Sequence, residues 1–257
     1  MKLQFIGTGA ADYDWKKYGE PGIAGSTSTL LDDTVLLDCG PTVPAALKRF
    51  GVDSMQITDI FLTHSHSDHF NIESVRQVAE GHTVRFHGSP QACEKVKDIC
   101  EVHPFEKYGD TAQVGGLCQV TAIPASHYLQ DLHEPAYLYI ITDNPGKSDS
   151  KTLLYALDTA WMPSVARAML GKTHLDAIVW DATMSQPGDW RIFDHSDPVM
   201  FKAIRQALYN SGNIDDSVKI WFDHRARTLW PADSAEQEAI ARHENVMLAH
   251  EGETVII

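Results

Sequence analysis

The sequence predicts an α/β fold in which two β-sheets pack together and helices cover the outside. About half of the predicted strands arrive as neighbouring hairpin partners, and the others alternate with helices. This mixture favours two packed sheets over a doubly wound parallel sheet. No linker and no internal repeat divides the 257 residues, so a single domain over residues 1–257 is expected.

The predicted strands are short runs of apolar and β-branched residues, each ended by a polar residue, a glycine or a proline. Residues 143–150, rich in Asn, Pro, Gly and Ser, form a predicted loop between two of them. The predicted strands cover residues 2–7, 28–31, 34–38, 59–63, 84–87, 119–124, 136–142, 152–157, 177–181, 219–222, 246–250 and 254–257.

The predicted helices lie between these strands and carry longer stretches of mixed apolar and polar residues. The clearest helix start is Asp197-Pro198, because aspartate is a good N-cap and proline fits the first helical turn. The predicted helices cover residues 42–50, 72–79, 90–100, 162–170, 198–209 and 234–243.

Composition excludes several classes of function. The net charge of −14 argues against a broad basic face, so long nucleic acid is not an expected partner, although a local patch for RNA stays open. No apolar run approaches the ~20 residues of a membrane span. The N-terminus has no secretory core, and the four cysteines show no Cys-x-x-Cys pair. We therefore expect a cytoplasmic protein with no membrane segment.

The most informative segment is residues 64–69, which read His-Ser-His-Ser-Asp-His directly after the predicted strand 59–63. His64 and His66 are two positions apart, so on an extended chain they project to the same side and can share one cation. Asp68 and His69 follow a turn and aim toward a second cation. Imidazole and carboxylate donors suit zinc or another first-row metal. The alternative is a polar loop whose histidines only cap the strand.

Further ligands have to come from elsewhere in the chain. His127, Asp158 and His224 each lie where a predicted buried strand ends, which is where a sheet can present polar groups to a shared site. Taken alone, each would be an ordinary residue at the end of a strand. Together with the motif at 64–69, they supply the missing coordination.

With these residues in place, the chain resembles the metallo-β-lactamase superfamily over nearly its whole length. The resemblance implies a four-layer αββα sandwich with two divalent metal ions at one edge. It also implies that Asp38 orients a ligand imidazole by accepting its distal N–H, although an Asp-Gly turn explains Asp38 equally well. The implied ligands are His64, His66 and His127 for one metal and Asp68, His69 and His224 for the other, with Asp158 bridging the two.

Within the superfamily, the chain is most similar to a phosphodiesterase branch that includes the tRNA 3′-end processing endonucleases and the accessory phosphodiesterase of the carbon–phosphorus lyase pathway. The matching segments are residues 7–11 (GTGAA), 157–160 (LDTA), 180–183 (WDAT) and 193–197 (FDHSD). In those relatives a histidine at the position of His195 acts on the scissile phosphate. Two features of the branch are missing: residues 11–16 lack the cysteines of a structural zinc site, and no Gly/Pro-rich arm for tRNA is visible.

The resemblance implies a hydrolase that cleaves a small or cyclic nucleotide-like phosphodiester through a metal-bridging hydroxide. The expected catalytic residues are Asp68, Asp158 and His195. Arg225 and Arg227 could bind a phosphate oxygen, or else form surface salt bridges. Zinc is the default metal, with manganese and iron as alternatives.

Other functions and partners also stay open. The same site could open a lactone, lactam or thioester, or the protein could bind metal without catalysis. The expected partner is a small phosphodiester substrate, and a homodimer is a further option. The segment Gly7-Thr8-Gly9 lacks the third glycine of a dinucleotide fingerprint, so nicotinamide binding is rejected.

Overall fold

The computed structural model describes residues 1–115 and 118–257, which form two compact units. Unit 1 comprises residues 1–106, 129–135 and 249–256, and unit 2 comprises residues 107–128, 136–248 and 257. Within the described residues, each unit is built on its own seven-stranded sheet. The prediction of one domain over residues 1–257 stays a prediction.

The sheet of unit 1 combines antiparallel and parallel pairing in the order β14-β1-β2-β3-β4-β5-β6. Neighbours from β14 to β3 run antiparallel, whereas neighbours from β3 to β6 run parallel. The strands are β1 (Lys2–Gly7), β2 (Ser28–Leu31), β3 (Val35–Leu37), β4 (Asp59–Phe61), β5 (Arg85–Gly88), β6 (Glu101–Pro104) and β14 (Thr254–Ile256).

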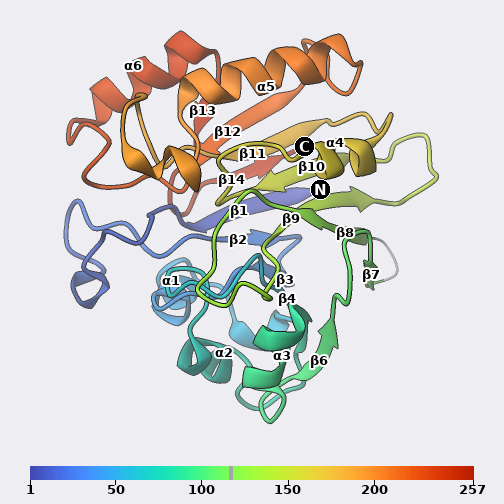
Figure 1. Cartoon of the computed structure of the whole chain (residues 1–257). Helices are drawn as coiled ribbons and strands as arrows, with labels where there is room; N and C mark the ends of the chain where they lie inside the picture. The colour runs from blue at the N-terminus through green and yellow to red at the C-terminus, as the bar shows by residue number, and fades with distance from the viewer. Residues whose placement is uncertain (116–117) are drawn as a thin grey trace. The chain divides into compact units, whose positions relative to one another are not determined.

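The helices of unit 1 connect its parallel strands, as parallel pairing requires. They are α1 (Val43–Arg49) after β3, α2 (Ile72–Val78) after β4 and α3 (Pro90–Val96) after β5. Their apolar sides share one buried core with Leu36 and Phe86 of the sheet. Figure 1 shows these helices, coloured blue to green, beside β3 and β4. The core thus fixes the ends of β3 and β4, from which site residues emerge.

The sheet of unit 2 has the order β13-β12-β11-β10-β9-β8-β7. Pairing is antiparallel from β7 to β10 and parallel from β10 to β13. The two units therefore repeat one plan, an antiparallel half followed by a parallel half. The strands are β7 (Thr111–Val114), β8 (Cys118–Pro124), β9 (Tyr137–Asp143), β10 (Thr152–Ala156), β11 (Ala177–Asp181), β12 (Lys219–Asp223) and β13 (Met247–Leu248).

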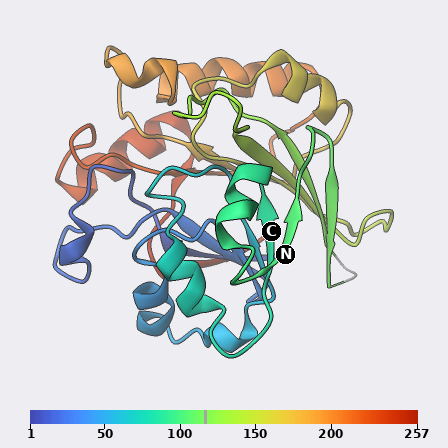
Figure 2. The same ribbon diagram turned by 60° about the horizontal axis from the view of Figure 1, so that its bottom comes forward.

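Helices α4 (Ser164–Leu170), α5 (Pro198–Asn210) and α6 (Ser234–Glu244) connect the parallel strands of unit 2. Figures 1 and 2 both show the long orange helix α5 lying across one face of this sheet. Phe201 of α5 packs between Trp180 and Phe222 of the sheet, with ring centroids 5.3 Å and 5.1 Å away. This aromatic core fixes the ends of β11 and β12.

The alternation of hairpins and helices confirms the predicted α/β class, and most predicted elements match within one or two residues. The prediction of a helix over 90–100 was wrong at its end: α3 stops at Val96, where the amides of Ile99 and Cys100 both bond to the Val96 carbonyl. The short strands β6 and β7 were missed. Each lies at the edge of its sheet and is largely exposed, so neither has an apolar run. No helix among the described residues has the length and apolar character needed to cross a membrane.

Replacing Asp197 by alanine is expected to lower the free energy of unfolding by about 1 kcal/mol, the usual value of a helix N-cap. The Oδ1 atom of Asp197 accepts hydrogen bonds from the amides of Val199 (2.7 Å) and Met200 (2.9 Å), which confirms the predicted start of α5. Urea unfolding followed by circular dichroism measures the change. Asp216→Ala, at an exposed position of the same unit, is the control. Equal midpoints for both variants would contradict the assignment.

Candidate metal centre

The motif at 64–69 is a tight turn attached to the ends of β3 and β4. The carbonyl of His66 accepts hydrogen bonds from the amides of His69 (3.0 Å) and Phe70 (2.8 Å). Cys39, just after β3, donates its amide to the carbonyl of His69 at 2.8 Å. A Cβ atom on Gly40 would lie 2.1 Å from the Asp68 carbonyl oxygen, so only glycine lets the two segments approach this closely. The turn is therefore held as part of the sheet edge.

Asp38 orients two of the motif's histidines through hydrogen bonds. Its carboxylate accepts hydrogen bonds from the amide and hydroxyl of Thr63 and from Nδ1 of His69, at 2.7, 2.9 and 2.8 Å. Because the Thr63 hydroxyl donates to Asp38, it can accept from Nδ1 of His64, 3.0 Å away. Both imidazoles thus carry their proton on Nδ1 and keep Nε2 as a ligand atom. Asp38 thus contacts a histidine of the motif, and the role of that histidine as a metal ligand stays a prediction.

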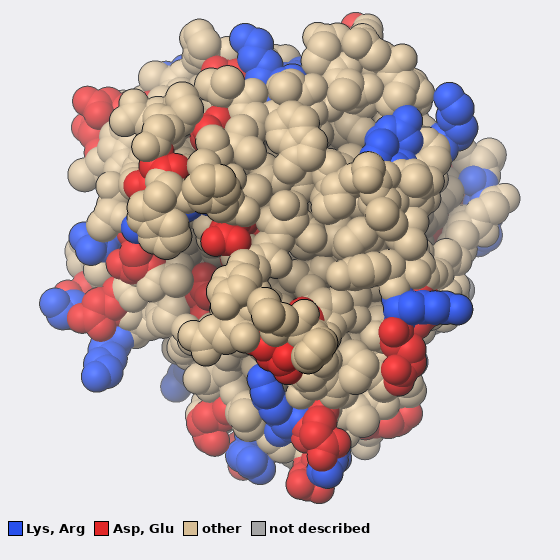
Figure 3. Space-filling view, in the orientation of Figure 1, with Lys and Arg blue, Asp and Glu red and all other residues tan. Residues whose placement is uncertain are grey.

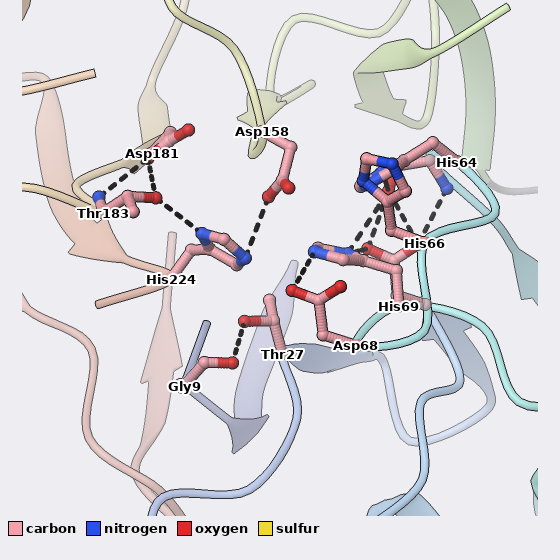
Figure 4. Close-up of polar contacts among 12 residues, drawn as sticks. Gly9, Thr27, His64, His66, Asp68, His69, Asp158, Asp181, Thr183 and His224 are labelled. Atoms are coloured by element: carbon pink, nitrogen blue, oxygen red, sulfur yellow. Dashed lines mark hydrogen bonds and ion pairs between the residues drawn. The ribbon is translucent and has the colours of Figure 1, made fainter. Parts of the chain in front are cut away.

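The other donors of the motif cluster in the same way. Nε2 of His64 lies 3.1 Å from Nδ1 of His66, so these two nitrogens converge as the shared-cation prediction requires. Nε2 of His69 lies 3.6 Å from Oδ2 of Asp68. Figure 4 shows these four side chains extending from one turn of the chain. Unit 1 therefore presents two donor pairs, one imidazole–imidazole and one imidazole–carboxylate.

In unit 2, two of the predicted ligands lie within two residues of a strand end, in a strained backbone conformation. Asp158 follows β10 with φ of 52°, and His224 follows β12 with φ of 58°. Non-glycine residues seldom adopt this left-handed conformation, which costs about 1–3 kcal/mol and is concentrated at functional sites. Asp38, after β3, has φ of 66° as well. At all three strand ends, the backbone bends sharply at a site residue.

The carboxylate of Asp158 faces a different imidazole with each of its oxygens. Oδ1 lies 3.1 Å from Nε2 of His224, and Oδ2 lies 3.5 Å from Nε2 of His127. His127 is oriented by its Nδ1 atom, which donates to the Asp194 carbonyl at 3.0 Å. Burial lowers the pKa of His127, which favours the neutral imidazole that binds metals. This arrangement suits a carboxylate that bridges two cations.

Asp181, the last residue of β11, organises the histidines of unit 2. Oδ1 accepts hydrogen bonds from the amide (2.8 Å) and hydroxyl (2.7 Å) of Thr183, and Oδ2 accepts from Nδ1 of His195 at 2.9 Å. The Thr183 hydroxyl in turn accepts from Nδ1 of His224 at 2.8 Å, as Figure 4 shows. His195 and His224 stack with ring centroids 5.3 Å apart. Both imidazoles therefore present Nε2 away from Asp181.

The two units use the same device. Each contains a buried aspartate at a strand end, whose carboxylate accepts hydrogen bonds from the amide and the hydroxyl of one threonine. One histidine is hydrogen-bonded to that hydroxyl, and a second histidine is hydrogen-bonded to the carboxylate. The corresponding sets are Asp38, Thr63, His64 and His69 in unit 1, and Asp181, Thr183, His224 and His195 in unit 2.

The residues that sequence reasoning missed are the supporting ones: Thr63, Asp181 and Thr183. A signal for part of this set was present, because Asp181 ends a predicted strand and Thr183 follows it two positions later as a second polar residue. Thr63 gave no such signal, since its partner Asp38 is 25 positions away. Burial raises the pKa of Asp38, while His69 and Thr63 act to lower it.

The predicted substrate residues differ in their surroundings. Arg225 is buried, donates to the Phe222 carbonyl at 3.2 Å and lies over the Trp230 ring. Its side chain thus has a structural task, whereas Arg227 is exposed. The role of either residue in binding phosphate stays a prediction.

The donor chemistry of each unit fits divalent cations. Imidazole nitrogens and carboxylate oxygens are common ligands of zinc and neighbouring metals. In unit 2, Asp158, Asp181, His195 and His224 each offer a ligand atom, all within 4.8 Å of one another. Nδ1 of His64, His69, His127 and His224 is engaged in a hydrogen bond, so Nε2 is the atom of each ring that could bind a metal.

Comparison with known proteins identifies the fold. The chain superimposes on the metallo-β-lactamase fold protein YhfI from Bacillus subtilis with a TM-score of 0.72 and 16% identity, covering 99% of this chain and 98% of that one. The chain has the metallo-β-lactamase fold. The predicted αββα sandwich class is thereby confirmed.

Sequence comparison matches parts of this chain to two kinds of protein. A family model described as anti-Pycsar protein Apyc1 matches residues 1–75. A ribonuclease Z from Picosynechococcus sp. is 32% identical over 129 residues, 44% of this chain and only 39% of that relative's length. The anti-Pycsar protein Apyc1 of Saccharibacillus brassicae is 22% identical over 212 residues, 73% of this chain and 79% of that protein.

Replacing Thr183 by valine is expected to weaken metal binding by about 10–100-fold, because the hydrogen-bond partner of a metal-binding histidine typically contributes that much. Valine keeps the shape of threonine but cannot connect His224 with Asp181. Competition with a chromophoric chelator measures zinc affinity. Thr142→Val, which removes a hydroxyl from the far end of β9, is the control. Equal zinc affinity in the two variants would contradict the role of Thr183.

Proposed function

We propose that the protein is a metal-dependent hydrolase of the metallo-β-lactamase fold that cleaves small phosphodiesters at a dinuclear centre. The observation that carries the proposal is Asp158, whose two oxygens each face the Nε2 atom of a different histidine. The proposed ligands are those implied by the sequence, His64, His66, Asp68, His69, His127, Asp158 and His224. Zinc is the proposed metal, with manganese or iron as alternatives.

Two bound cations would supply an activated water and charge neutralisation for the substrate phosphate. The chain's own residues supply orientation and proton transfer. His195 is fixed by Asp181 through Nδ1, and its side chain is 15% exposed, so Nε2 can hold a proton for the leaving oxygen. Oδ2 of Asp158 also lies 4.0 Å from Nδ1 of His195.

Exposed aromatic rings next to these histidines support a substrate that carries a ring. Tyr128 follows His127 and is 57% exposed, and Phe193 lies two positions before His195 and is 80% exposed. Asp194 ties the two segments together, because its carbonyl accepts from His127 and its carboxylate accepts from the Tyr128 amide at 3.1 Å. Phe193 belongs to a short 3₁₀ helix, Trp190–Phe193, that the sequence did not indicate. A nucleobase could stack on these rings.

Charge supports a small substrate over a long nucleic acid. The net charge is −14, and on the face shown in Figure 3 the Lys and Arg groups are scattered among Asp and Glu groups. A protein that tracks a nucleic-acid backbone would concentrate positive charge along one path. The similarity to a protein named ribonuclease Z supports phosphodiester chemistry itself. The four cysteines are buried free thiols, in keeping with the proposed cytoplasmic compartment.

The zinc-loaded protein is expected to hydrolyse bis(p-nitrophenyl) phosphate. Asp158→Ala is expected to abolish turnover and reduce the metal content below two ions per chain, as measured by mass spectrometry. His195→Ala is expected to lower kcat by about 10²–10⁴-fold at unchanged metal content, the usual contribution of a general acid.

His174→Ala, at an exposed histidine of unit 2, is the matched control for these variants. Turnover that neither substitution changes would reject the mechanism. Hydrolysis of lactones with no activity toward phosphodiesters would instead support the acyl-hydrolase alternative. Fewer than two metals in the unsubstituted protein would support metal binding without catalysis.

Phe193→Ala is expected to raise KM for a cyclic nucleotide about 5- to 150-fold while kcat changes little, because loss of one stacking ring costs about 1–3 kcal/mol of binding. Initial rates over a range of substrate concentrations separate the two constants. Val199→Ala, at an exposed apolar residue of α5, is the control. An unchanged KM would exclude Phe193 from the substrate site.

A further inference from the structure

A buried glutamate outside the ligand set contacts the centre of the metal-binding motif. Glu134 belongs to the segment Leu129–Pro135, which is part of unit 1 although the strands before and after it, β8 and β9, are in unit 2. Its side chain is largely buried, with 8% of the residue exposed. Burying a carboxylate costs free energy unless both of its oxygens accept hydrogen bonds, so the partners of Glu134 matter.

The two oxygens of Glu134 bind two serine hydroxyls from separate parts of unit 1. Oε2 accepts a hydrogen bond from Ser65 at 2.7 Å, and Oε1 accepts one from Ser89 at 2.9 Å. Ser65 lies between His64 and His66, whose facing nitrogens are 3.1 Å apart. Ser89 is the N-cap of α3, and its hydroxyl accepts a hydrogen bond from the amide of Ala92 at 3.0 Å. Glu134 therefore connects the motif to a fixed helix end.

The segment that carries Glu134 is itself held in place. The backbone amide of Glu134 donates to the Asp131 carbonyl at 3.0 Å, and the amide of His133 donates to the Asp131 side chain at 2.9 Å. Gln91 of α3 donates its side-chain amide to the His133 carbonyl at 3.0 Å. These bonds fix the backbone of Glu134. The glutamate can therefore restrain the position of Ser65, instead of moving when Ser65 moves.

We propose that Glu134 is a positioning residue for the metal centre and acts through Ser65. A carboxylate can only accept, so both serine hydroxyls must donate to it, and this fixes the rotamer of Ser65. A fixed Ser65 holds the backbone between His64 and His66, and hence the separation of their ligand nitrogens. Thr63 and Asp38 set the orientation of the His64 ring, whereas Glu134 sets the spacing of the pair. This inference rests on the proposed metal-dependent function.

Zinc affinity of the full chain tests the proposal. Glu134→Ala is expected to raise at least one of the two zinc dissociation constants by about 10–100-fold, as loss of a hydrogen-bond partner that positions metal ligands does. Glu134→Gln retains one acceptor oxygen, so a smaller rise is expected. Ser65→Ala should weaken binding as well, and adding it to Glu134→Ala should change little more, because the two residues act as one unit. Glu80→Gln, an exposed position of unit 1, is the control.

Amide hydrogen exchange of the metal-free protein gives a second readout that does not depend on activity. In Glu134→Ala, exchange at residues 64–69 is expected to accelerate at least several-fold, while β4 stays protected. Zinc affinity of Glu134→Ala equal to that of the control, or additive effects with Ser65→Ala, would overturn this inference and leave the proposed function standing. Failure of the unsubstituted protein to bind zinc would overturn both.

Discussion

The hydrogen bond between a buried aspartate and a neighbouring threonine determines how the candidate metal centre is built. Asp38 with Thr63, and Asp181 with Thr183, each satisfy a carboxylate with the amide and hydroxyl of one residue. Because the hydroxyl donates to the carboxylate, it can only accept from the histidine beside it. The protonation of that imidazole is therefore fixed before any metal binds. Without this constraint, each ring could turn its proton toward the ligand position.

The strand ends that carry these groups combine rigidity with strain. Asp38, Asp158 and His224 all have a left-handed backbone, which is unfavourable for residues with a Cβ atom. The adjoining strands can sustain this cost because each is buried in a core of large apolar side chains, such as Trp180 and Phe222 in unit 2. The packing of these apolar cores thus holds the three residues in a left-handed backbone conformation that they would not adopt alone.

The amino-acid sequence predicted much of the fold and pointed to the candidate ligands, for physical reasons that particular residues illustrate. β11 is a nearly continuous apolar run, β1 alternates polar and apolar residues before its buried end, and the Asp197 cap is local, so all three were predicted at the right residues. Edge strands β6 and β7 are exposed and have no such pattern. The motif at 64–69 was evident because its donors are adjacent in sequence. Thr63 and Glu134 were not, because their partners are distant and their side chains are chemically ordinary.

The repeated support also shows how one scaffold can serve two chemical roles. His69 and His195 are bound to their aspartates in the same way, yet the His69 side chain is completely buried whereas 15% of the His195 side chain meets solvent. Access alone thus separates a histidine suited to bind an ion from one suited to exchange protons with water. A change in how far neighbouring residues cover the ring would therefore alter its role, with the sheet and its polar anchor left unaltered.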